Sequence, residues 1–69
     1  MTYAVRIAHE AEKILDRLDK PTEGRLRSRL TQLAENPLDP RLSSSLVQRA
    51  GIRKSRVGNW RILFSIDRE

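Results

Sequence analysis

The spacing of hydrophobic positions changes twice along the chain, and each change predicts a different element. Over Tyr3 to Ile7, apolar and other side chains alternate at a period of two, which predicts a short strand. From Glu10 the period lengthens to that of an amphipathic helix. The apolar positions at i, i+3, i+4 and i+7 are Ala11, Ile14, Leu15 and Leu18. We therefore expect a strand followed by a helix that ends near Asp19.

A second helical pattern follows after a very short link. Asp19-Lys20-Pro21-Thr22 ends the first helix and begins the next, with Pro21 or Thr22 near its N-cap. The apolar positions at i, i+4, i+7 and i+8 are Leu26, Leu30, Leu33 and Ala34. This helix is expected to stop at Asn36-Pro37, because the residue before a proline disfavours helical backbone. The short link predicts an antiparallel pair of helices with the leucines in the core.

The last third of the chain predicts a β-hairpin. The segment from Leu38 to Gln48 contains prolines and a serine run, so we expect a loop there. Ile52–Val57 and Trp60–Ile66 are strand-like, and Gly58-Asn59 between them favours a two-residue turn. The predicted fold is therefore α+β, in the order strand, two-helix antiparallel hairpin, antiparallel β-hairpin, with the helices packed on one face of a small sheet.

A two-residue turn also predicts which side chains share a face of the hairpin. The face expected to cover the helices carries Ser55, Val57, Trp60, Ile62, Phe64 and Ile66, and Trp60 is assigned to the core. The opposite face carries Lys54, Arg56, Arg61, Leu63 and Ser65. Arg56 and Arg61 are thus predicted to be cross-strand neighbours, with Cβ atoms about 4.5–5.5 Å apart.

The positive charge of the chain lies entirely in its second part. The sequence has 14 basic and 9 acidic residues, for a net charge of +5. Residues 1–40 hold seven of each kind, so the whole excess follows residue 40. Such a one-sided block indicates a polyanionic partner, either nucleic acid or an acidic protein segment. The alternative is a solvated basic face that has no partner.

Three of these cations are candidates for one anion site. Like charges placed opposite each other in a sheet are destabilising, and an anion between Arg56 and Arg61 removes that cost. Lys54 lies two residues along the same predicted face, and Arg53 is a further candidate phosphate ligand in the same run. Guanidinium groups bind phosphate or carboxylate through two parallel hydrogen bonds. The alternative is that these cations are solvated and contribute little.

Composition excludes several classes of site. The chain has no cysteine and a single histidine, His9, which removes thiolate zinc sites, a cysteine nucleophile and any histidine pair. We therefore expect neither a metal nor a cofactor. The apolar runs are too short to span a membrane, and the N-terminus lacks the apolar region of a secretory signal. A cytoplasmic protein of one domain is expected.

The order of elements and the segment from Arg53 to Asp67 resemble the RelE/ParE toxin superfamily. Its members carry the motif R-x-x-R-V-G-D-Y-R, then two hydrophobic residues, and then Y-x-hydrophobic-D. In this chain Asn59, Trp60 and Phe64 replace the usual Asp, Tyr and second Tyr. Residues 3–18 and Glu35-Asn36-Pro37 are also similar to family motifs, so the resemblance spans essentially the whole chain.

The resemblance implies a toxin of a type II toxin–antitoxin pair. The RelE branch cleaves mRNA in the ribosomal A site, where a ribose 2′-hydroxyl attacks the adjacent phosphate. By their match to the motif, Lys54 is the candidate for proton transfer or phosphate contact, and Arg56 for phosphate binding. Arg61 is the candidate that stabilises charge on the scissile phosphate. The alternatives are a ParE-like, non-enzymatic inhibitor of DNA gyrase and an inactive, binding-only remnant.

The resemblance also implies partners for the chain, and it shows where the chain differs from the family. Family members continue from the turn at Asp67 into another strand, which carries further catalytic residues. We therefore expect residues 1–69 to form a toxin domain shortened at its C-terminus, with an unpaired sheet edge that can support a homo-oligomer. Three explanations of the shorter C-terminus remain open: a shortened chain, a natural degenerate toxin, and a short variant whose site is completed by a partner. Expected partners are a cognate antitoxin that masks the basic face, the ribosome with mRNA, and operator DNA, but no membrane.

Overall fold

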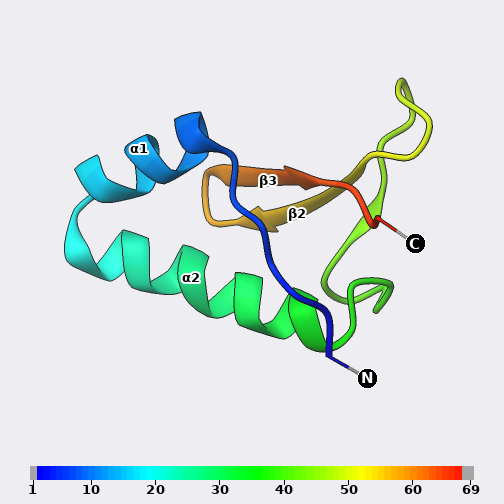
Figure 1. Cartoon of the computed structure of the whole chain (residues 1–69), viewed down its shortest axis with the longest axis horizontal. Coiled ribbons are helices and arrows are strands. Elements are labelled where there is room, and N and C mark those ends of the chain that lie inside the picture. Colours follow the sequence, from blue (N-terminus) through cyan, green and yellow to red (C-terminus); the bar gives the residue numbers. More distant parts are fainter. Residues whose placement is uncertain (1, 68–69) are drawn as a thin grey trace.

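Two helices precede a three-stranded antiparallel sheet in the computed structural model, which describes residues 2–67 (Figure 1). The elements are α1 (His9–Arg17), α2 (Lys20–Glu35), β1 (Ser44–Ser45), β2 (Arg53–Val57) and β3 (Trp60–Phe64). The strands lie in the order β1-β2-β3. The chain reverses between the two helices, so that they form a helical hairpin beside the sheet (Figure 1). This arrangement confirms the α+β class.

The start of α2 is capped by Asp19, two residues before Pro21 and three before Thr22. Asp19 is the N-cap, and its carboxylate accepts hydrogen bonds from the backbone N–H of Thr22 at 3.0 Å and from its hydroxyl at 2.9 Å. Pro21 lies in the first turn, where its missing N–H costs no helical bond. Pro21 and Thr22 thus lie in the first turn, near the N-cap as predicted, and the cap itself is the Asp19 carboxylate, which accepts from the free N–H groups.

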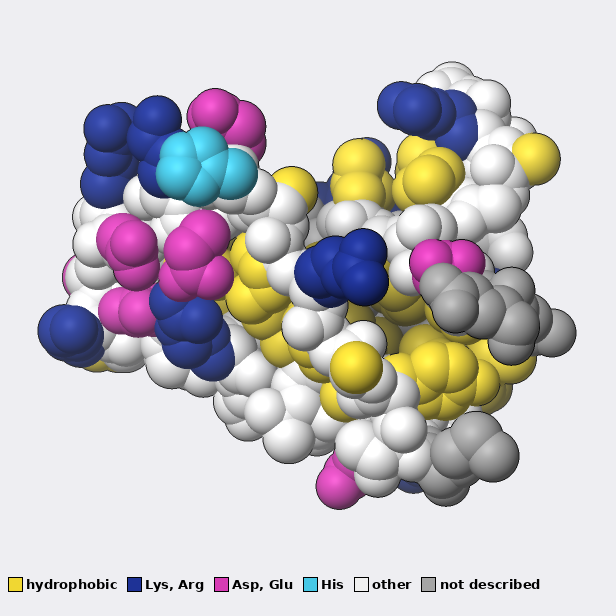
Figure 2. Space-filling view, viewed as in Figure 1, with side chains coloured by type: hydrophobic (Ala, Val, Ile, Leu, Met, Phe, Trp, Pro, Cys, Tyr) yellow, Lys and Arg dark blue, Asp and Glu magenta, His cyan; other side chains and the backbone are white. Residues whose placement is uncertain are grey.

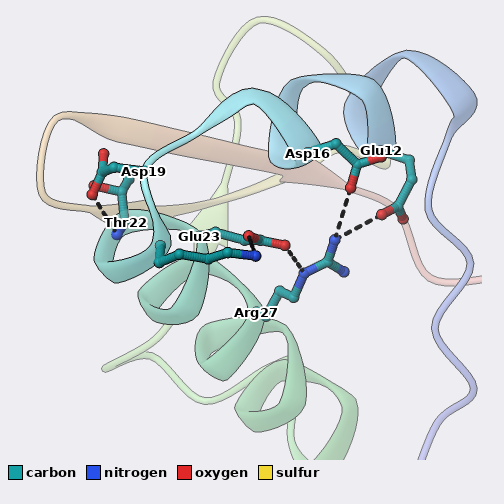
Figure 3. A network of polar contacts seen from close by, with 7 residues as sticks. Glu12, Asp16, Asp19, Thr22, Glu23 and Arg27 are labelled. Carbon is teal, nitrogen blue, oxygen red and sulfur yellow. Dashed lines mark hydrogen bonds and ion pairs between the residues drawn. The ribbon is translucent and has the colours of Figure 1, made fainter.

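Arg27 of α2 connects the two helices through carboxylates on both (Figure 3). Its Nη2 lies 2.7 Å from Oε2 of Glu12 and 3.7 Å from Oδ1 of Asp16, both on α1. Its Nε lies 2.9 Å from Oε2 of Glu23, one turn earlier on α2. Hydrogen bonds to Glu12 and then Glu23 raise the pKa of Arg27. One cation thus balances three acids at the junction of the helices.

The β-hairpin has the predicted register. Gly58 takes a positive φ of 61° in the turn, a conformation that glycine adopts without strain. The paired residues are Val57 with Trp60, Arg56 with Arg61, Ser55 with Ile62, and Lys54 with Leu63. Ser55 and Val57 are buried at 1% and 9% exposure. Arg56, which lies between them, faces outward, as the period of a strand requires.

The core draws one buried side chain from each of three elements: Leu15 of α1, Leu26 of α2 and Val57 of β2. Ile7, Leu18 and Ile62 pack against this cluster and are partly buried. Leu33 is also buried, which confirms the core assignment of the α2 leucine face at two of its positions. This small core joins the helical hairpin to one face of the sheet.

The predicted strand over residues 3–7 is absent from the described part of the chain. The segment is extended, but its one backbone contact with another element is the N–H of Tyr3 donating to the carbonyl of Ala34 at 2.7 Å. An alternating pattern alone does not make a strand, because a strand also needs a neighbouring ladder. Conversely, β1 lies inside the predicted loop and pairs with Arg53 and Lys54.

Trp60 also differs from its prediction. It lies on the same side of β3 as Ile62 and Phe64, but it is 41% exposed instead of buried in the core. Its cross-strand partner Val57 is buried, whereas Trp60 lies on β3 at the edge of the sheet. The prediction followed the register correctly and overestimated how far the core extends.

Candidate functional site

The predicted cations lie together on the face of the sheet that points away from the core. The register places Arg56 of β2 directly opposite Arg61 of β3, and both side chains are exposed. Lys54 lies two residues before Arg56 on the same face and is half-buried. Burial of Ser55 and Val57 on the inner face sets this outward orientation. We call Lys54, Arg56 and Arg61 the open-face cations.

None of the open-face cations has an acidic partner within residues 2–67. The ion pairs of that region involve Lys20, Arg27 and Arg41. The side chains of the open-face cations also make no hydrogen bond to another described residue. No acid of the described part of the chain therefore compensates their charges, and the Arg56–Arg61 pair brings like charges together across two strands. This arrangement favours an anionic ligand.

Arg53, the fourth candidate, lies elsewhere. Its Nε donates to Oγ of Ser43 at 3.0 Å, its Nη2 to the carbonyl of Ser43 at 3.3 Å, and its Nη1 to Oγ of Ser45 at 3.3 Å. The Ser43 hydroxyl in turn donates to the carbonyl of Pro37 at 2.6 Å. Arg53 thus holds the loop before β1 against the sheet. Its role as a phosphate ligand stays a prediction, with three of its donors already engaged.

Two arginines that the sequence did not indicate lie next to Lys54 and Arg56. A pocket of about 250 Å³ at this corner of the sheet is also lined by Arg29 of α2 and by Arg41 of the loop. The remaining lining residues are Pro40, Leu42, Ser43 and Ser44, so the pocket contains four cations and no acid. Helical periodicity places Arg29 beside the apolar face of α2, but the contact with β2 depends on tertiary structure.

Arg29 also shapes the backbone of the site. Its Nη1 donates to Oγ of Ser55 at 2.8 Å and to the carbonyl of Arg56 at 2.9 Å. Its Nε donates to Oε1 of Gln32 at 3.1 Å. The guanidinium therefore fastens α2 to β2 at the residue that carries an open-face cation. Ser55 is 1% exposed, and this hydrogen bond satisfies its hydroxyl in the interior.

Arg41 is already paired with an acid. Its Nη2 lies 3.0 Å from Oδ2 of Asp39, and its backbone N–H donates to Oδ1 at 2.9 Å. These bonds lower the pKa of Asp39 and raise that of Arg41. Arg41 thus adds less free positive charge to the pocket than Lys54 and Arg56 do.

The arrangement has the properties of a phosphate-binding surface. Arg56 and Arg61 offer guanidinium donors that pair with no carboxylate of residues 2–67, and guanidinium donors suit phosphate oxygens. No group of three or more histidine, aspartate or glutamate side chains over residues 2–67 is placed to hold a metal ion. Neither described helix is long and apolar enough to cross a membrane.

Comparison with known families identifies one match. The model of the family described as "ParE toxin of type II toxin-antitoxin system, parDE" matches residues 5–69, which is nearly the whole chain. No curated protein and no solved structure matches the chain significantly. The match includes the β-hairpin, and therefore all three open-face cations.

Proposed function

Because the chain belongs to the ParE toxin family of type II toxin–antitoxin systems, and so has a cognate antitoxin, we propose that it inhibits translation by cleaving mRNA on the ribosome. The observation that carries this proposal is the cross-strand pair Arg56–Arg61 with Lys54 beside it, all without an acidic partner among the described residues. A substrate with closely spaced phosphates supplies the missing negative charge. A surface that only required solubility has no need to place two arginines opposite each other.

The proposed chemistry uses the open-face cations at one phosphate. The 2′-oxygen of a ribose attacks the adjacent phosphorus, and the bond to the 5′-oxygen of the next nucleotide breaks. The products are a 2′,3′-cyclic phosphate and a free 5′-hydroxyl, so no water or co-reactant is consumed. Arg61 stabilises the negative charge that grows on the phosphoryl oxygens, and Arg56 holds the phosphate in place. Lys54 is the residue proposed to transfer the proton or to contact the same phosphate.

A reconstituted translation reaction tests this proposal. Primer extension on the mRNA is expected to detect cuts with the unchanged protein and to show a loss of about 100-fold or more for Arg61→Ala, since removing one preorganised donor has that order of effect. Arg17→Ala removes an exposed arginine at the end of α1 and is the matched control, expected to cut normally. Inhibition of translation without any cut mRNA contradicts the proposal.

A second candidate function is poisoning of DNA gyrase, favoured by the ParE name of the matching family. Its signature is double-strand DNA breaks that depend on gyrase, with mRNA left intact. The same protein samples can be assayed with purified gyrase and supercoiled plasmid. Breaks that persist in Arg61→Ala, together with uncut mRNA, replace the first proposal by the second. Absence of both activities indicates a protein that only binds its partners.

A further inference from the structure

A second basic site lies where α2, the loop after it and the first two strands meet. It is the pocket of about 250 Å³ that is lined by Arg29, Arg41, Lys54 and Arg56. This volume is many times the roughly 10–15 Å³ that one water needs, so a small anion fits together with water. Arg41, Arg56 and the lining Ser44 are exposed, which leaves the pocket open to solvent. On the face that Figure 2 shows, by contrast, acidic side chains gather over the helical hairpin.

The guanidinium of Arg29 is a half-buried cation without a counter-charge in the described part of the chain. It donates to the hydroxyl of Ser55, the carbonyl of Arg56 and the amide oxygen of Gln32, which are all neutral. Its Nη2 donates to no residue among 2–67. A partly buried charge of this kind is costly unless an opposite charge lies near it. An anion in the pocket therefore lowers the free energy of the folded state.

The hydroxyl of Ser44 is a neutral donor on the other wall of the pocket. Ser44 of β1 is the cross-strand partner of Lys54, so the two side chains lie on the same face of the sheet. Its hydroxyl has no hydrogen-bond partner among the described residues, whereas those of Ser43 and Ser45 accept from Arg53. Serine hydroxyls beside basic side chains are common phosphate contacts in proteins that bind nucleic acids.

Arg41 contributes little net charge to this site. Its guanidinium is bonded to Asp39 through Nε and Nη2, and the side chain of Asp39 is 13% exposed. The pocket thus has three cations that no acid of residues 2–67 compensates, namely Arg29, Lys54 and Arg56. They come from two elements, α2 and β2, and converge on one small volume.

Arg56 connects this pocket to the pair of arginines on the open face. It lines the pocket and also lies opposite Arg61, so it borders both anion positions. The two positions are about 5 Å apart across the sheet, one strand spacing, with a shift of about 3 Å along β2 toward Lys54. This separation is comparable to one nucleotide of a single strand. Two free anions that close repel each other, whereas two phosphates of one strand are already joined.

We propose that the pocket is a second phosphate subsite, which holds the phosphate next along the same nucleic-acid strand from the one between Arg56 and Arg61. Arg29 and Ser44 are its ligands, and Arg56 and Lys54 lie between the two subsites. The ligand is therefore a single strand with two consecutive phosphates, bound in preference to a free phosphate ion. This assignment rests on the nucleic-acid ligand of the function proposed above.

A short strand of three thymidines, TpTpT, tests the subsite with the full-length protein. It has two phosphates and no 2′-hydroxyl, so the proposed chemistry cannot cut it. In two matched isomers, one phosphate or the other is replaced by an uncharged methylphosphonate. Binding is followed by the shift of the backbone amide signal of Ser44 in ¹H–¹⁵N NMR spectra. We expect TpTpT to bind about tenfold more tightly than either isomer, because only TpTpT engages both subsites.

Two variants assign that advantage to the pocket. Arg29→Gln removes the charge but keeps an N–H donor for Ser55, and is expected to reduce the advantage from about tenfold to about twofold. Ser44→Ala removes an exposed hydroxyl that bonds no described residue, and is expected to halve the advantage roughly. If Arg29→Gln proves to be unfolded in a thermal scan, Ser44→Ala decides alone.

Arg49→Ala is the matched control for loss of charge. Arg49 is exposed in the loop between β1 and β2 and does not line the pocket, so the advantage of TpTpT should be unchanged. Equal losses in Arg29→Gln and Arg49→Ala mean that the protein attracts the strand only through its net charge, and overturn the proposal. Inorganic phosphate or a blocked glutamate dipeptide that binds as tightly as TpTpT overturns it as well.

These measurements contain no ribosome and no cleavable RNA. A protein that gains affinity from the second phosphate as described but cuts no mRNA supports the subsite and contradicts only the proposed nuclease function. A protein that cuts mRNA but binds TpTpT and its isomers equally well contradicts only the subsite.

Discussion

The two halves of the molecule carry similar cations and treat them differently. On the helical hairpin, Arg27 is surrounded by three carboxylates, two of them within hydrogen-bond distance. On the sheet, Arg56 and Arg61 face each other without any acid among the described residues. The helical cation is used to hold two elements together, whereas the sheet cations are held close to one another by the register of the hairpin.

This difference separates charge used for stability from charge available to a ligand. Paired side chains lower the free energy of the folded state modestly and bind nothing else. Like charges in a fixed geometry make the opposite contribution, and the repulsion is relieved only when an anion arrives. The comparison can therefore be tested by giving the sheet cations an acidic partner, or by removing one charged side chain from the sheet or from the helical hairpin.

The largest effect is expected from Arg61→Glu, which gives the open face an ion pair like those of the helices. The new carboxylate lies opposite Arg56, so the thermal unfolding midpoint should stay the same or rise slightly. Phosphate binding is lost, and mRNA cleavage in a reconstituted translation reaction should fall by about 100-fold or more. An unfolding scan run beside the cleavage assay distinguishes this result from simple misfolding. Unchanged cleavage contradicts the comparison.

The next effect concerns Lys54→Ala and the dependence of RNA binding on salt. Each cation that displaces counterions from RNA contributes about one to the slope of log K against log salt. We expect Lys54→Ala to reduce the magnitude of that slope by about 0.7–0.9, measured by fluorescence anisotropy with a labelled single strand. Lys13→Ala, on the exposed side of α1, should leave the slope as it is. Equal slopes for both variants contradict a phosphate contact by Lys54.

A smaller effect, on stability alone, is expected from Arg27→Ala. Loss of the guanidinium leaves the carboxylates of Glu12 and Glu23 close together, with only Lys20, 3.8 Å from Glu23, as a nearby cation. The unfolding midpoint, followed by circular dichroism, should fall by a few degrees and recover partly in high salt. Arg25→Ala is the matched control, because Arg25 has only a 3.5 Å contact with Thr22. RNA binding should be normal in both variants.

The smallest effect is a pH dependence that arises at the N-cap of α2. Hydrogen bonds from Thr22 lower the pKa of Asp19 below its ordinary range near 4, so the folded state favours the carboxylate. This stabilisation is complete above that range and is lost as the pH falls through the lowered pKa. Asp19→Asn keeps an acceptor but cannot titrate. Its unfolding midpoint should therefore change less between pH 5 and pH 2, at about constant salt, than that of the unchanged protein.

Local patterns were sufficient to predict the elements whose signals lie within a few residues. The two-residue turn at Gly58-Asn59 determined the register, and the register placed Arg56 opposite Arg61. The helical periodicity located α1 and α2 to within a few residues. The open face of the candidate site was therefore predictable, because a hairpin is a local structure.

Features that depend on distant neighbours were not predictable in this way. The alternation over residues 3–7 suggested a strand, but the ladder that defines a strand needs an adjacent backbone. β1 was missed for the converse reason, since only its pairing with β2 distinguishes Ser44–Ser45 from a loop. Arg29 was missed because its hydrogen bonds cross from α2 to β2. The exposure of Trp60 likewise depends on the position of β3 at the edge of the sheet, which the local pattern does not determine.

The bond from Arg29 to the carbonyl of Arg56 has a consequence for solubility. Proteins form fibres through their sheets when every molecule has two unpaired strand edges, because each edge can then pair with a different neighbouring molecule. β1 pairs with the first part of the outer edge of β2, and the Arg29 guanidinium occupies the carbonyl at Arg56 beyond it. The edge opposite β3 therefore offers little more than the two residues of β1, whereas β3 offers five. We expect association through strands to occur at β3 and not to propagate from the other edge.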